Sequence, residues 1–74
     1  MAPTDSHRVV CHLDVLLTDR NMTLTELADI VGITIVNLSV LKNDRAKAIR
    51  FSTLTAICDA LSCKPGDVFS IDSP

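Results

Sequence analysis

With 74 residues and a formal net charge of −2, this chain has room for one small domain with a thin margin of stability. A length of this kind leaves no space for a catalytic domain with a deep cleft. Hydrophobic residues make up 47% of the sequence but aromatic residues only 3%, so the core must consist of Leu, Ile and Val, which favours packed helices.

Targeting and metal signals are missing from the sequence. No stretch approaches the roughly 18 consecutive apolar residues of a membrane span, and residues 1–7 lack the basic and apolar regions of a signal peptide. We therefore expect a soluble, cytoplasmic protein with no membrane contact. Cys11, Cys58 and Cys63 are odd in number and lack C-x-x-C spacing, so we expect free thiols, no metal site and no cofactor.

The first expected element is a helix from about Val10 to Asp19, which follows a flexible tail of residues 1–7. Its apolar residues recur at the three-to-four spacing of an amphipathic helix, namely Val10, Leu13, Leu16 and Leu17. The pair Arg20-Asn21 should end this helix.

Two short helices joined by a glycine are expected next. Thr23 and Glu26 fit a capping box, which begins a helix of about Leu24 to Val31 with Leu27, Ala28 and Val31 facing inward. Gly32 permits the left-handed backbone conformation that ends a helix within one residue. Thr34 is then the expected N-cap of a third helix, about Ile35 to Lys42, with Leu38 and Leu41 facing inward.

After a basic loop of residues 43–50, a fourth helix is expected from about Ser52 to Leu61. Its apolar stripe is Leu54, Ile57, Cys58 and Leu61, so Cys58 is better explained as a small buried hydrophobe than as a nucleophile. Pro65 should open a last helical turn within Lys64–Phe69, with Phe69 closing the core. Ser70–Pro74 should be extended or frayed. The prediction is an all-α, compact five-helix bundle over residues 8–71, with a C-terminal tail at 72–74.

The register of three residues points to a helix-turn-helix. Ala28 lies four residues before Gly32 and Leu38 six residues after it. Ala28 is small enough for the second helix to cross closely over the first, and Leu38 fills the angle between them. A plain helical hairpin is the alternative reading of the same spacing.

These residues also resemble a known family, the small Cro/C1-type (XRE-like) helix-turn-helix proteins. The resemblance extends from Leu13 to Phe69 and implies a phage-repressor-like fold of five helices, major-groove binding of double-stranded DNA by the third helix, and a homodimer. The matching residues are Met22-Thr23, Glu26-Leu27-Ala28, Gly32-Ile33-Thr34, Leu38-Ser39, Leu41, Asn43, Lys47, Ile49-Arg50-Phe51, Thr53-Leu54, Ile57-Cys58, Ala60-Leu61, Cys63 and Pro65-Gly66-Asp67.

The candidate DNA-binding residues lie on the third helix and in the loop after it. With Leu38 and Leu41 inward, 100° per residue leaves Val36, Val40 and Asn43 outward, with Ile35 and Ser39 flanking them. Relatives usually carry hydrogen-bonding side chains at the positions of Ile35 and Val40, whereas aliphatic side chains can contact thymine methyl groups or respond to groove shape. The full candidate set is Thr34, Ile35, Val36, Asn37, Ser39, Val40, Lys42, Asn43, Arg45 and Lys47.

Charge supports that assignment but leaves an alternative open. Residues 42–50 carry four cations and one acid, a local charge of +3, so the rest of the chain carries −5. A basic pole of this kind attracts phosphate. The alternative function is a protein-interaction module, antitoxin-like or dimerising, that uses the apolar outer face of the third helix. An enzyme is the weakest interpretation: Cys11, His12 and Asp14 resemble a catalytic triad in the sequence, but adjacent residues of a helix point about 100° apart and cannot share a proton productively.

Overall fold

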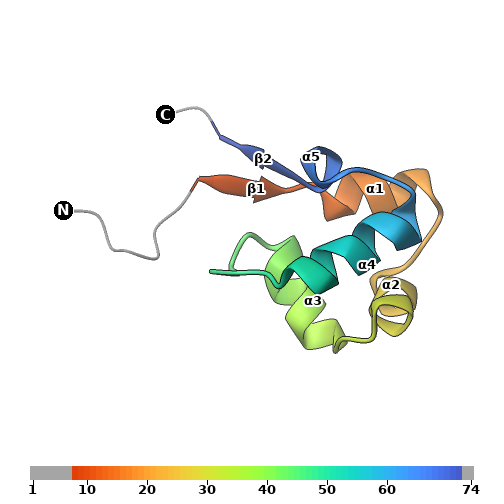
Figure 1. The fold of residues 1–74 in the computed structure, drawn as a ribbon. Coiled ribbons are helices and arrows are strands. Elements are labelled where there is room, and N and C mark those ends of the chain that lie inside the picture. The colour runs from red at the N-terminus through yellow and green to blue at the C-terminus, as the bar shows by residue number, and fades with distance from the viewer. Residues whose placement is uncertain (1–7, 73–74) are drawn as a thin grey trace.

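The computed structural model of the chain describes residues 8–72, in which five helices and two short strands follow one another (Figure 1). The predicted tail at 1–7 lies outside the described residues, as do residues 73–74. In chain order the elements are β1 (Val9–Cys11), α1 (Leu13–Asp19), α2 (Leu24–Val31), α3 (Ile35–Lys42), α4 (Phe51–Leu61), α5 (Pro65–Val68) and β2 (Phe69–Ile71).

The all-α prediction is wrong in one respect, because β1 and β2 form a small antiparallel sheet. Val9 pairs with Ile71 and Cys11 with Phe69, so the helix expected from Val10 begins only at Leu13. The β-branched residues Val9 and Val10 favour an extended backbone once a partner strand is available. His12, which was expected on a helix face, instead precedes α1. Its Nε2 lies 2.6 Å from the Ser70 hydroxyl oxygen.

The expected helix boundaries in the middle of the chain are confirmed. The Thr23 hydroxyl accepts a hydrogen bond from the Glu26 amide at 3.1 Å, and the Glu26 carboxylate accepts one from the Thr23 amide at 3.3 Å. This reciprocal box begins α2.

At the end of α1, the Arg20 Nε donates to the Leu61 carbonyl at 2.5 Å, which ties that end to the C-terminus of α4.

The turn between α2 and α3 is as tight as predicted. Gly32 adopts the left-handed conformation, with φ of 84°, and its amide donates to the Ala28 carbonyl. The Thr34 hydroxyl then accepts from the Asn37 amide at 3.1 Å and caps α3. The chain direction changes by 115° between the two helices, within the ~90–120° of helix-turn-helix units.

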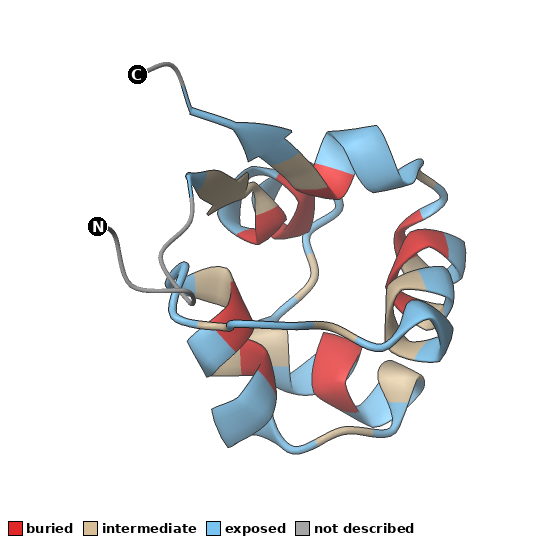
Figure 2. Cartoon of the chain, turned by 60° about the vertical axis from the view of Figure 1, so that its left-hand side comes forward, coloured by how far each residue is buried: buried red, intermediate tan, exposed pale blue. Residues whose placement is uncertain are grey.

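A single aliphatic core lies where the five helices meet, and Figure 2 shows the buried segments of the helices turned toward the centre. Phe69, predicted to close the core, is only half-buried, and Val68 takes that place with no exposed surface. Phe69, the first residue of β2, packs against the edge of this core. The buried residues are Leu13, Leu16, Leu17, Leu27, Ala28, Leu38, Leu41, Ile57, Cys58, Leu61 and Val68.

Within the part of the chain that the structure describes, no single helix is long and apolar enough to cross a membrane. The helices α2 and α3 together have the length and apolar composition of a span, but they are sharply bent against each other.

Replacement of Gly32 by Val should destabilise the fold by about 1–3 kcal/mol, because a β-branched residue strongly disfavours positive φ. No atom lies within 4 Å of an added Cβ there, so the whole cost comes from the backbone. Chemical denaturation measures it. Gly66→Ala is the control, since an added Cβ also meets no atom there and Gly66 lacks positive φ. If the Gly32→Val and Gly66→Ala variants had the same free energy of unfolding, the left-handed conformation of Gly32 would not be required by the fold.

Candidate nucleic-acid interface

The outer face of α3 is aliphatic and exposed. Ile35, Val36 and Val40 keep 44%, 67% and 38% of their surface accessible. Leu38 and Leu41 on the opposite side are buried, as helical periodicity requires when one face packs on the core. The structure therefore brings together, on one accessible surface, the three aliphatic residues predicted to face outward.

Polar candidates at the ends of α3 also hold the helix in place. Thr34 and Asn37 are exposed, and the Thr34 hydroxyl that caps the helix still has its own proton to donate. At the other end, the Asn43 side-chain amide donates to the Ser39 carbonyl at 3.0 Å and to its hydroxyl at 3.3 Å. Ser39 is half-buried, so its hydroxyl is less accessible than the neighbouring aliphatic groups.

Lys42 is half-buried and paired with an acid that sequence reasoning missed. Its Nζ lies 3.3 Å from the Asp14 carboxylate on α1. Asp14 is 71% exposed, so the pair contributes little to stability, less than about 1 kcal/mol. It nevertheless offsets one positive charge of the basic pole, which leaves less charge for a phosphate than the sequence count suggests.

The segment between α3 and α4 carries Arg45, Lys47 and Arg50, all exposed. Asp44, the single acid of this segment, holds it against β1, because its carboxylate accepts a hydrogen bond from the Cys11 amide at 2.7 Å. Asp44 also adopts positive φ, 62°, which lets the chain reverse after α3. In Figure 1 this segment lies below β1, consistent with that link.

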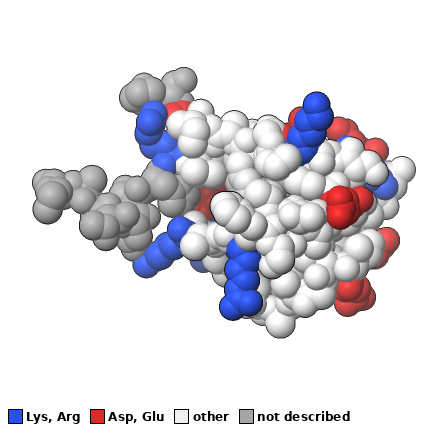
Figure 3. Space-filling view, in the orientation of Figure 1, with Lys and Arg blue, Asp and Glu red and all other residues white. Residues whose placement is uncertain are grey.

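Opposite charges gather at opposite sides of the molecule. In Figure 3, Lys and Arg side chains cluster at the left, around the strands and the segment between α3 and α4. Most Asp and Glu side chains lie along the right side, and the middle of this face is largely uncharged. The net charge of −2 thus hides a molecule with a basic end next to α3.

Two of the three cysteines have thiols that are hard to ionise. Burial raises the pKa of the Cys58 thiol above its usual 9.0, and the neighbouring Cys63 adds to the rise. Burial also raises the pKa of Cys11. Both thiols are therefore protonated at neutral pH and poor nucleophiles. Within residues 8–72, no cluster of three His, Cys, Asp or Glu residues is arranged to hold a metal.

Comparison with known proteins gives concordant matches. The profile of the Cro/C1-type HTH DNA-binding domain matches residues 12–73. The uncharacterized HTH-type transcriptional regulator YozG of Bacillus subtilis (strain 168) is 55% identical over 65 residues, which cover 88% of this chain and 77% of that protein. The crystal structure of the transcriptional regulator VanUg superposes with a TM-score of 0.75 at 26% identity, over 100% of this chain and 99% of that one.

Replacement of Asp44 by Ala should lower the free energy of unfolding by about 1–3 kcal/mol. The change removes the acceptor for the Cys11 amide. It also places Ala, whose side chain forms no hydrogen bond, at a position with positive φ. Asp44→Asn is the matched control, since Asn keeps an acceptor oxygen and tolerates that conformation. Thermal unfolding and hydrogen exchange of the Cys11 amide check both variants. Unchanged exchange in Asp44→Ala would show that this link does not hold the segment.

Proposed function

Because the chain belongs to the Cro/C1-type helix-turn-helix DNA-binding domain family and is a DNA-binding transcriptional regulator, we propose that it inserts α3 into the major groove of double-stranded DNA. One observation carries the proposal: the exposed face of α3 lies directly beside the basic segment of residues 43–50. A major groove about 12 Å wide accepts one helix, and phosphates flank it on both sides. With α3 in the groove, the cations of residues 43–50 would lie close to the flanking phosphates.

Arg45 and Lys47 hold phosphates in this proposal, because both are exposed and follow directly on α3. Thr34, Asn37 and Asn43 supply hydrogen bonds to the sugar-phosphate backbone from the two ends of the helix. These contacts fix the position and orientation of the protein without reading the sequence. Lys42 contributes less, since its ammonium group already faces Asp14.

Base reading falls to Ile35, Val36 and Val40, with Ser39 beside them. Aliphatic side chains form no bidentate bond with guanine or adenine, so they favour sites with thymine methyl groups and suitable groove shape. Ser39 contributes one hydroxyl proton, because its oxygen already accepts from Asn43. We accordingly propose a preference for T-rich half-sites with modest discrimination.

The proposal includes a homodimer on a palindromic operator, in the cytoplasm. A single α3 reads only a few base pairs, and two copies related by a twofold axis double the contact with DNA. Half-sites one helical turn apart, about 34–36 Å, suit such a pair.

A second candidate function is a protein-interaction module, including an antitoxin-like role. The observation that favours it is the same aliphatic cluster on α3, because exposed apolar patches often mark protein contacts. In that case a partner protein, rather than DNA, would cover Ile35, Val36 and Val40.

Salt dependence tests the phosphate contacts. Arg45→Ala and Lys47→Ala should each weaken binding to specific and random duplexes alike and lower the slope of log affinity against log salt by about 0.9. Lys64→Ala, an exposed lysine at the start of α5, is the control and should leave that slope unchanged. Loss of binding to one sequence only, at an unchanged slope, would contradict these assignments.

Replacing Ile35 and Val40 together with Gln separates the two functions. If α3 enters the major groove, the double variant should select different sequences from random duplexes than the wild type does, while its non-specific affinity for DNA stays about the same. The fold should be unaffected, because both side chains are exposed. If the variant instead changes oligomeric state or partner binding with no altered sequence preference, α3 is not the reading helix.

A further inference from the structure

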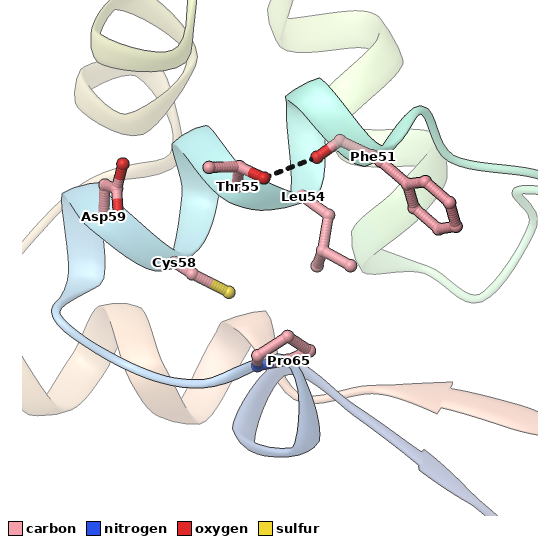
Figure 4. Close-up of a pocket in the computed structure, with 6 residues that line it drawn as sticks. All are labelled: Phe51, Leu54, Thr55, Cys58, Asp59 and Pro65. Atoms are coloured by element: carbon pink, nitrogen blue, oxygen red, sulfur yellow. Dashed lines mark hydrogen bonds between the residues drawn. The ribbon is translucent and has the colours of Figure 1, made fainter.

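An open apolar hollow lies beside α4, on a surface that the DNA proposal leaves unused. Phe51, Leu54, Thr55, Cys58, Asp59 and Pro65 line it, and its volume is about 460 Å³. Figure 4 shows Cys58 and Leu54 directed from α4 toward Pro65, with the Phe51 ring at one end. Phe51 is 85% exposed, the most exposed of the large hydrophobic residues that the structure describes.

The residues of this surface share one face of α4. Phe51, Leu54, Thr55 and Cys58 follow the i, i+3, i+4, i+7 pattern, so they form a stripe two helical turns long. The Thr55 hydroxyl donates to the Phe51 carbonyl at 2.8 Å, so its proton is already satisfied. Covering this stripe would therefore bury apolar groups without leaving the hydroxyl proton unpaired.

We propose that a second copy of this chain covers the hollow, with the two α4 helices antiparallel about a twofold axis near Leu54 and Thr55. Phe51 of each copy then enters the hollow of the other beside Leu54 and Pro65, because equal displacements along the two helices bring residue 51 opposite position 58, where the Cys58 side chain forms the buried floor. This assignment rests on the homodimer of the proposed function and gives that dimer its contact surface.

Shape and charge both favour a second copy over an unrelated protein. A twofold interface requires a patch that is complementary to itself, and here the protruding ring and the hollow occur on one stripe. The charges agree: α4 begins after the basic segment that ends at Arg50 and carries Asp59 near its other end. An antiparallel arrangement brings the basic end of one copy to the acidic end of the other, and the helix dipoles oppose each other favourably.

The size of the surface sets the strength of the contact. Interfaces that bury less than about 1,200 Å² in total are transient. A patch built on six lining residues is small enough for that class, so we expect a weak, transient dimer without DNA.

Sedimentation equilibrium up to about 1 mM protein tests the assignment. The wild type should dimerise, and Phe51→Ala should weaken the dimer about tenfold or more, as loss of a central aromatic contact does. Thr55→Arg, which places a charge at the axis, should also abolish it. Ile30→Ala on α2 is the matched control, since its side chain is 59% exposed and lies outside the hollow. Circular dichroism confirms the fold of each variant.

The proposal is overturned if the wild type is monomeric at 1 mM, or if the Phe51→Ala variant dimerises as tightly as the wild type. It is also overturned if Val36→Gln breaks the dimer while Phe51→Ala leaves it intact. Binding to a duplex too short for two copies is measured in parallel. That binding needs one copy only, so it tests the role of α3 in DNA binding independently of the α4 surface.

Discussion

The three-residue turn that begins at Gly32 is the constraint on which the rest of the structure depends. Gly32 ends α2 in the left-handed conformation, Thr34 caps α3, and the two helices differ in direction by 115°. Ala28 is buried beside this turn, and Leu38 reaches the core with no exposed surface. Because α2 packs against both α3 and α4, the same turn places one side of α3 on the core and leaves the other accessible. The candidate interface is thus a consequence of the turn.

Features set by neighbours in sequence were predictable. The capping box of Thr23 and Glu26, the Thr34 cap and the positive φ of Gly32 all depend on residues within three or four positions. The outward direction of Val36 and Val40, with Ile35 flanking them, followed from helical periodicity once the inward leucines were identified. The main part of the candidate surface could therefore be derived from local chemistry alone.

Features that join distant residues were not predictable from one sequence. The Asp44 bond to Cys11 spans 33 residues, and β1 pairs with a strand at the opposite end of the described chain. The runs Val9–Cys11 and Phe69–Ile71 carried a signal, since both are short and rich in strand-forming residues, but helical spacing after residue 10 masked the first. The pairing of Lys42 with Asp14 likewise required the fold, because the two residues lie on different helices that are far apart in the sequence.

We propose that α3 and the segment after it form the DNA-binding surface. Amide chemical shifts of the labelled protein, followed by NMR during titration with a duplex, test it most directly. The account predicts that the shift changes concentrate at residues 34–47 and diminish as salt rises. Changes confined to α1, α2 or the hollow beside α4, with α3 unaffected, would contradict it.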